Sequence, residues 1–563
     1  MNSLVSFLYR HPVLTGFLMV VLAVCTAVLQ RPFGLHNDDM QIYFLLLNGG
    51  VAEGTLGYGL YTNHALGSCM AFFSYMWPSV NVYLVFLLFL SIVACCSANF
   101  YVLSTQNKEK DQDDGYSKLH RLVTLCLLFI INVMCMRTLQ YTQVAVWAAV
   151  CGVLLLCSVE KSGSWWVLRS LFATLLLIGA FCLRESALVP AAFVAMAAVC
   201  AKKFQNKRAL GAIGCVAVLL GALHVYNELA YQASPEWQDA RRYLSLRVKI
   251  LDSKDNSGLD KGAQLEAIGV SPRSFDMYKS FIYTPSLGDT ERVKQCLSIH
   301  REGRKGLFGC KWLADAGFLA RSPHDKQGDT TLLMKLTAWV PLLLATILFL
   351  PATQKRTLSA ACVMLLAVIA YVGILIAFQR AVGRVVNPVL YVAAVWVLAL
   401  PLGKTRINES KLCHLCTLGV SVVCILFVTR HWHFWERSDP AAYYCAAHPD
   451  TLYLTTCQQG LGLYPRGLDG YSASWLKKSN ILPIADGWSF YSPAYKAALR
   501  ARGFESLQDA MLHANTLIVI RQSDKEWVLQ KLPELAHCEW GKKIELSIVD
   551  TYGEFYFAKV IQK

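Results

Sequence analysis

Long apolar runs constrain this chain of 563 residues more than any other feature. A helix of about 20 apolar residues crosses roughly 30 Å of hydrocarbon, and runs close to that length recur along the sequence. Only 16% of the residues are charged, against about 25% in a typical soluble domain. The sequence therefore predicts an α-helical polytopic membrane protein with about 11 spans, at residues 11–30, 80–103, 121–136, 138–157, 165–183, 185–201, 209–230, 331–352, 357–378, 386–402 and 411–429.

The first apolar run follows Arg10 and extends from Val13 to Leu29. A secretory signal peptide has a shorter apolar core and a cleavage site of small residues. The sequence Leu29-Gln30-Arg31-Pro32 is a poor cleavage site. We therefore expect an uncleaved first helix.

Basic residues orient the predicted spans. Lys and Arg are concentrated in short loops that fall on one side of the membrane, which is the positive-inside pattern; these loops are 104–120, 158–164, 202–208, 353–356 and 403–410. The apolar segment 63–77 is too short for a span and is predicted to be an interfacial or re-entrant helix. Counting it as a span would move every later basic loop outside. We expect the N-terminus inside, in a membrane that is the bacterial cytoplasmic membrane.

This topology predicts two domains. Residues 1–430 form a transmembrane domain that carries a first outer loop at 31–79 and a large outer loop at 231–330. Residues 431–563 form a soluble outer α/β domain, with strands expected at 451–455, 516–521 and 544–560 and helices at 493–502 and 507–514. Ser492 and Pro493 are expected to start the first of these helices.

Several classes of function are disfavoured. The net charge of +15 would suit nucleic acid, but many of the basic residues lie in the loops that orient helices, and no zinc finger, P-loop or GxGxxG motif is present. The histidines show no metal-ligand spacing. Five of the 20 cysteines lie in the long polar segments, and their order suggests Cys296–Cys310 and Cys445–Cys457 pairs with Cys538 left over.

An acidic pair follows the first span. Asp38 and Asp39 come a few residues after it, and carboxylates near hydrocarbon are costly unless they meet water or a partner. They are therefore candidate catalytic residues. The alternative is that they cap a helix that begins near Met40, because Asp is a favoured cap and negative charge suits a helix N-terminus.

Arginines gather on the same predicted side. Arg184 and Glu185 form a tight turn between two spans, where Arg184 suits a phosphate and Glu185 would neutralise it when the site is empty. Arg380 and Arg384 are cationic on the outside, against the positive-inside rule, and Arg137 lies on that side as well. For each of these, an ordinary turn or helix end that exposes its arginine remains the alternative.

Two further segments carry candidate groups. Residues 236–251 are predicted to form an amphipathic helix over the site, with Arg241, Arg242 and Arg247 expected to be solvated. Trp475, Trp488, Tyr491 and Tyr495 are predicted to be exposed in the outer domain; their rings would suit a sugar or, equally, a core.

These signals agree in one respect. Two carboxylates and several arginines all fall at one membrane face, although the topology was assigned from other residues. A lipid-linked phosphate presents its anion at that depth. A carboxylate can take a proton from an acceptor hydroxyl, and arginine can stabilise a leaving phosphate.

The layout resembles the GT-C glycosyltransferases, which use sugars on polyprenyl or dolichyl phosphate. It shares one amino-terminal span, an acidic pair that opens the first outer loop, many further spans and a soluble outer C-terminal domain. Asn37-Asp38-Asp39 and the interfacial helix look most like bacterial O-antigen glucosyltransferase-like proteins. The resemblance implies that Asp38 or Asp39 is the catalytic base, and that Arg184 with Arg380 or Arg384 holds the lipid phosphate. A second acidic motif of some branches is not evident, which leaves open whether a divalent metal is required.

The resemblance predicts transfer of a sugar from a polyprenyl-phosphate carrier to a cell-surface glycan or lipid acceptor, with membrane lipids as further partners and no nucleic acid. Two alternatives remain open. A transporter or flippase of lipid-linked oligosaccharide would place charges at the bilayer midplane, and spans such as 13–29 carry none. A polymerase or ligase would also place arginines outside.

Overall fold

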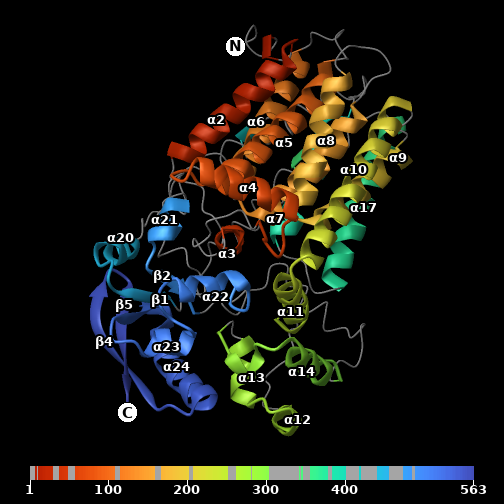
Figure 1. Ribbon diagram of the computed structural model, residues 1–563. Coiled ribbons are helices and arrows are strands. Elements are labelled where there is room, and N and C mark those ends of the chain that lie inside the picture. Colours follow the sequence, from red (N-terminus) through yellow and green to blue (C-terminus); the bar gives the residue numbers. More distant parts are fainter. Residues whose placement is uncertain are drawn as a thin grey trace. The chain divides into compact units, whose positions relative to one another are not determined.

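The computed structural model (Figure 1) describes residues 7–8, 10–29, 37–47, 57–107, 115–137, 139–158, 166–201, 207–251, 261–279, 282–302, 342, 344–346, 355–377, 383–400, 418–419, 440–455, 473–484 and 489–563. The chain forms two compact units. The helical unit consists of Met1–Gly34, Val85–Leu223 and Phe308–Glu436. The mixed unit consists of Leu35–Leu84, His224–Leu307 and Arg437–Lys563.

Apolar helices make up the described part of the helical unit. They are α2 (Pro12–Leu29), α5 (Val82–Asn107), α6 (Gly115–Arg137), α7 (Tyr141–Cys157), α8 (Trp166–Leu183), α9 (Leu188–Cys200), α10 (Lys207–Gln232), α17 (Lys355–Ala377) and α18 (Gly383–Leu398). Helix α7 is the centre of this unit: it is buried from Tyr141 to Leu156 and packs against α8, α9 and α18. At Gly152 an added Cβ would lie 2.9 Å from Leu177, so glycine allows α7 and α8 to approach closely.

Exposed apolar side chains identify the protein as an integral membrane protein. Leu171 on α8 and Val218 on α10 are among many large apolar side chains that face outward, and a soluble monomer does not expose apolar surface on this scale. Three described helices are long and apolar enough to cross a membrane: Val82–Gln106, Trp166–Leu183 and Ala209–Gln232. Shorter apolar helices accompany them. The count of 11 spans and the orientation stay predictions, because 331–352 and 411–429 lie mostly outside the described residues.

The mixed unit combines short helices with one sheet. Its helices are α3 (Asn37–Leu46), α4 (His64–Met76), α11 (Pro235–Leu251), α12 (Gly262–Ala267), α13 (Pro272–Lys279), α14 (Thr290–Glu302), α20 (Pro440–Ala447), α21 (Ala473–Lys478), α22 (Pro493–Arg500), α23 (Leu507–Leu512) and α24 (Lys525–Trp540). The strands are β1 (Leu452–Thr455), β2 (Ile481–Pro483), β3 (Thr516–Arg521), β4 (Ile544–Tyr552) and β5 (Phe555–Gln562). Their order is β2-β1-β3-β5-β4, with β1 parallel to β2 and β3 and with β5 antiparallel to β3 and β4.

The predicted C-terminal α/β structure is confirmed. Strands β1, β3, β4 and β5 occupy the three predicted strand regions, and α22 and α23 occupy the two helical ones. Ser492 caps α22 and accepts a hydrogen bond from the Tyr495 amide. Gly553, at φ +60°, opens the two-residue turn between β4 and β5, where a positive φ suits a tight hairpin. The division of the whole chain at residue 430 stays a prediction.

Two expectations about side chains are wrong. Arg247 was expected to be solvated, but it is fully buried and its guanidinium lies 5.0 Å from the Tyr278 ring and 5.7 Å from the Tyr491 ring. Tyr495 was expected to be exposed, but it belongs to the core between the sheet and its helices. Arg242 is exposed as expected. Amphipathic spacing located the helix correctly, and tertiary packing decided which polar residues it buries.

Candidate functional site

The acidic pair lies at the start of a short helix. Helix α3 begins at Asn37, so Asp38 and Asp39 occupy its first turn, one turn earlier than the start near Met40 that the capping alternative assumed. Negative charge in that turn is favourable for the helix itself. The side chains of these two residues lie outside the described part of the structure. Their catalytic role therefore stays a proposal.

The other end of α3 is held firmly within the mixed unit. The Tyr43 hydroxyl lies 2.9 Å from Ser74 Oγ of α4, and the Tyr43 ring stacks on Tyr83 at 5.9 Å. Leu45 is buried in a cluster with Trp237. Because a helix rises about 1.5 Å per residue, Asp38 begins about 10 Å along the axis from Leu45. The contacts at the end of α3 thus determine where the backbone of Asp38 and Asp39 lies within the mixed unit.

Aromatic rings tie the first loop to α11. Tyr58 stacks on Trp237 at 4.9 Å and meets the edge of Tyr231 at 5.2 Å, and its hydroxyl donates to the Ala230 carbonyl at 3.1 Å. The Tyr231 hydroxyl accepts a hydrogen bond from the Leu60 amide at 3.0 Å. These contacts join segments more than 160 residues apart in sequence, so the loop between α3 and α4 packs against the end of α10 and against α11.

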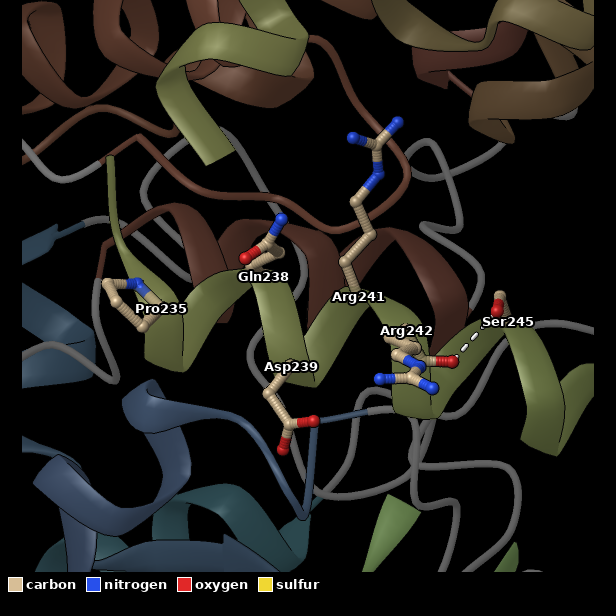
Figure 2. Close-up of a pocket in the computed structure, with 6 residues that line it drawn as sticks. All are labelled: Pro235, Gln238, Asp239, Arg241, Arg242 and Ser245. Atoms are coloured by element: carbon tan, nitrogen blue, oxygen red, sulfur yellow. Dashed lines mark hydrogen bonds between the residues drawn. The ribbon is translucent and has the colours of Figure 1, made fainter. Parts of the chain in front are cut away.

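A polar cavity of about 460 Å³ follows the outward face of α11 (Figure 2), lined by Pro235, Gln238, Asp239, Arg241, Arg242 and Ser245. Figure 2 shows Gln238 and Arg241 on one side of the helix and Asp239 on the other. Arg241 lies 4.7 Å from the Tyr231 ring centre and 2.7 Å from Glu228. The cavity offers both charges, an amide and a hydroxyl. The sequence analysis missed Gln238 and Asp239, although their spacing along the helix places them beside the predicted arginines.

The Arg242 and Asp239 side chains are each held from a second helix. Arg242 pairs with Glu291 of α14 at 3.2 Å, and the Thr290 hydroxyl donates to Asp239 at 2.9 Å. The ends of these side chains are therefore placed by α14 as well as by α11. An exposed ion pair such as Arg242–Glu291 adds little stability, so its value is in positioning charge.

Arg184 lies at one end of the helical unit, in the turn between α8 and α9. Its Nη1 donates to the Tyr141 hydroxyl at 3.0 Å and to the Thr142 hydroxyl, and its Nε donates to Ser186 Oγ at 2.9 Å. The guanidinium carbon is 5.3 Å from the Tyr141 ring centre. Glu185 follows in a short 3₁₀ turn. The sequence prediction missed Thr142 as a partner of Arg184.

These contacts use Nε and Nη1 of the Arg184 guanidinium and leave Nη2 without a hydrogen-bond partner among the described residues. A guanidinium has five N–H donors, and the three bonds above use both hydrogens of Nη1 and the one on Nε. Within the described residues, the two Nη2 hydrogens make no hydrogen bond. A guanidinium held in place by hydroxyls and a ring, with Nη2 still able to donate, suits a phosphate oxygen as partner.

Two more of the predicted arginines begin or end helices at the same end of the helical unit. Trp147 of α7 packs on Tyr391 of α18 with ring centres 6.2 Å apart, and each ring is about two turns from the start of its helix. The starts of α7 and α18 are therefore level. Arg384 is the second residue of α18, and Arg137 ends α6 four residues before α7 begins.

The structure leaves other site predictions untested. Arg380 lies outside the described residues, as do the side chains of Arg137, Arg384, Trp475 and Trp488. The predicted Cys296–Cys310 and Cys445–Cys457 pairs are wrong, because Cys296 and Cys445 are free cysteines, each buried in an apolar cluster. Among the described residues no group of three His, Cys, Asp or Glu side chains could hold a metal ion. A divalent metal stays an open expectation from the sequence.

Comparisons with known proteins give no family. No protein-family model and no curated protein sequence matches the chain. Among solved structures, the chain is similar to ArnT from Cupriavidus metallidurans in the apo state, with 10% identity over 96% of both chains and a TM-score of 0.38. It is also similar to the same protein bound to undecaprenyl phosphate, with 10% identity over 96% of this chain and 97% of that one and a TM-score of 0.36. Scores of this size do not establish a shared fold, so the resemblance to GT-C glycosyltransferases rests on the sequence features.

Proposed function

We propose that this protein transfers a sugar from a polyprenyl-phosphate carrier to a cell-surface glycan or lipid acceptor at the outer face of the membrane. The geometry of Arg184 is the observation that carries the proposal. An arginine held by hydroxyls and a ring, whose two Nη2 hydrogens bond to no other described residue, lies at the end of a bundle of apolar helices. Arg137 and Arg384 stand at that same end. A lipid phosphate presents its charge at this depth of a membrane.

The reaction needs one base and one anion site. The carboxylate of Asp38 or Asp39 takes the proton of an acceptor hydroxyl. The acceptor oxygen then attacks the anomeric carbon of the donor sugar from the face opposite the phosphate. The bond between that carbon and the phosphate oxygen breaks, its electron pair leaves with the polyprenyl phosphate, and the anomeric configuration inverts. Arg184 stabilises the charge that develops on the leaving phosphate.

Glu185 and the neighbouring arginines tune the anion site. Glu185 directly follows Arg184 and limits the net positive charge of the turn when no donor is bound. Arg384 and Arg380 add positive charge for the lipid phosphate, and Arg137 strengthens the field at the end of α6. Arginine is suited to this task because it stays charged and its planar fork matches phosphate geometry.

The cavity on α11 is proposed as the surface that binds the acceptor. Sugar hydroxyls both donate and accept hydrogen bonds, and the cavity offers the Asp239 carboxylate, the Gln238 amide and the Arg241 and Arg242 guanidinium groups. Its volume of about 460 Å³ lies within the range of small-molecule sites, roughly 300–1,000 Å³. The ion pairs with Glu228 and Glu291 hold the Arg241 and Arg242 side chains in place beside the cavity.

A reconstituted assay tests this proposal. Purified protein in vesicles receives polyprenyl-phosphoryl hexose and membrane extract as the source of acceptor, and released polyprenyl phosphate is measured. Asp38→Asn and Asp39→Asn are compared with Asp450→Asn, which alters an exposed carboxylate in the turn before β1. We expect at least one of the first two to abolish release and the third to retain it.

The products separate the alternatives. Attachment of a single sugar supports the transferase. Joining of whole repeat units, with no release from monosaccharide carriers, supports a polymerase or ligase instead. Movement of intact lipid-linked oligosaccharide across the vesicle membrane supports a flippase. Full activity in both acidic-pair variants would remove Asp38 and Asp39 from the site.

A further inference from the structure

An apolar groove of about 460 Å³ runs along the surface of the helical unit, between α2, α5, α7 and α8. The side chains that line it are almost wholly apolar, and several of these side chains, such as Phe17 and Leu168, are well exposed. One charged side chain, Arg169, lines it. The groove lining consists of Val13, Phe17, Ile92, Val93, Cys96, Ser97, Phe100, Leu155, Leu168, Arg169 and Phe172.

A hydrogen bond and a ring contact are among the interactions that hold Arg169 at this groove. Its Nη1 donates to the Ser158 carbonyl at the end of α7, at 2.6 Å, and its guanidinium carbon lies 4.8 Å from the centre of the Phe100 ring. The side chain is partly buried. A guanidinium held over a ring beside an apolar groove presents a positive charge where the surrounding surface has low polarity, and such a charge favours an anionic partner.

The groove is far from the proposed phosphate site. Arg169 is in the first turn of α8, and Arg184 follows the last residue of that helix. Fifteen residues at about 1.5 Å each separate them by about 22 Å along the helix axis. Arg169 and Arg184 therefore belong to opposite membrane surfaces, and one phosphate cannot contact both.

The length of the groove fits one leaflet. From Phe100 to Ile92 the lining of α5 extends about 12 Å along the helix axis. Half of the hydrocarbon thickness is about 15 Å. An acyl chain that lies in this groove would therefore have its charged end at the membrane surface, beside Arg169, and its tail towards the middle of the bilayer.

We propose that this groove binds one anionic phospholipid from the leaflet opposite Arg184, with an acyl chain against α5 and α8 and the phosphate on Arg169. The positive charge selects an anionic over a zwitterionic headgroup, because the latter carries its own cation. The arrangement gives the protein a bound structural lipid that is separate from its proposed donor.

The test uses the full protein in nanodiscs made of phosphatidylcholine with a minor fraction of phosphatidylglycerol whose acyl chain carries a mid-chain diazirine. Irradiation followed by peptide mass spectrometry locates the adducts. We expect adducts on residues 92–100 of α5 and 168–172 of α8. Arg169→Ala is expected to lower their yield about tenfold, which is the loss for one charge-assisted contact.

Three comparisons separate a specific site from ordinary lipid contact. Cys96→Phe fills the groove without altering Arg169 and should also reduce the adducts. Arg121→Ala removes an arginine of α6 that does not line the groove and should leave them unchanged. A phosphatidylcholine carrying the same diazirine should label the groove weakly in the wild type.

Adducts spread evenly over the apolar surface would overturn the proposal. So would equal labelling by the two lipids, or an Arg169→Ala yield equal to that of Arg121→Ala. The thermal unfolding midpoint of each variant is measured in parallel, and labelling is compared only among variants that remain folded. The proposed transferase activity is not part of the readout, so its failure and the failure of the lipid site are distinguishable.

Discussion

Replacing Arg184 tests the anion site most sharply. Its side chain makes three hydrogen bonds to hydroxyls, of which that to Tyr141 measures 3.0 Å and that to Ser186 measures 2.9 Å. Its two Nη2 donors bond to nothing else in the part of the chain that the structure describes. Removing one donor that stabilises a developing oxyanion lowers kcat about 10²–10³-fold, or about 2.7–4 kcal/mol. Arg184→Met removes both and should lower kcat by at least that factor.

Two milder variants set the scale. Arg184→Lys keeps the charge but loses the planar fork, so its loss should lie between that of the methionine variant and the wild type. Tyr141→Phe removes one hydrogen bond that positions the guanidinium and keeps the ring beneath it. A typical hydrogen bond contributes about 1 kcal/mol, so this variant should lose roughly fivefold.

The assay is steady-state consumption of polyprenyl-phosphoryl sugar at saturating donor in vesicles, with binding of the product polyprenyl phosphate measured separately. The thermal unfolding midpoint shows whether each variant is folded. A folded Arg184→Met protein whose kcat stays within about threefold of the wild type would refute the reasoning, because a group that stabilises the leaving phosphate contributes far more than that.

Two further predictions concern the mixed unit. Gly67→Ala would place a Cβ 1.9 Å from the Gly57 carbonyl oxygen, so it should lower the unfolding midpoint, at a cost of about 1–3 kcal/mol. Gly214→Ala should not lower the midpoint, because an added Cβ there has nothing within 4 Å. A Gly67→Ala midpoint equal to that of the Gly214 variant would contradict the close approach. The hydrogen bond to Asp550 raises the pKa of Tyr444 to about 12. The contribution of this hydrogen bond to stability is therefore present below pH 10 and is lost as pH rises through 12. The ultraviolet titration of Tyr444 is obtained as the difference between the curves of the wild type and Tyr444→Phe. Its midpoint should lie near pH 12 and should be lower in Asp550→Asn. An unchanged midpoint in Asp550→Asn would exclude the hydrogen bond between Tyr444 and Asp550.

Local sequence signals predicted the local structure well. The strand at 516–521 and the cap at Ser492 are specified by residue types within a few positions of each other, and both occur as predicted. The amphipathic pattern of 236–251 likewise located α11 to within one residue. These features depend on backbone preference and periodicity, which a sequence displays directly.

Long-range packing was not predictable in the same way. Arg247 is buried because Tyr278 and Tyr491 cover it, and Tyr491 lies more than 200 residues further along the chain. Thr142 reaches Arg184 across 42 residues, and its type alone gives no sign of that contact. The polar spacing of Gln238 and Asp239 on α11 was visible, but a periodic pattern alone does not show that a cavity lies beside them. The acidic pair was proposed as catalytic because adjacent carboxylates near a membrane surface are costly, which is a local argument, and that role stays a proposal.

The most direct test of the central claim is a mass profile of surface glycans and lipid-linked sugars in cells that lack this protein. The cells are complemented with the wild type or with the double variant Asp38→Asn/Asp39→Asn. Sugar transfer by the acidic pair predicts that one sugar mass disappears, returns with the wild type and stays absent with the double variant, while the lipid-phosphate sugar accumulates. Unchanged glycans, or whole repeat units that accumulate without export, would contradict it.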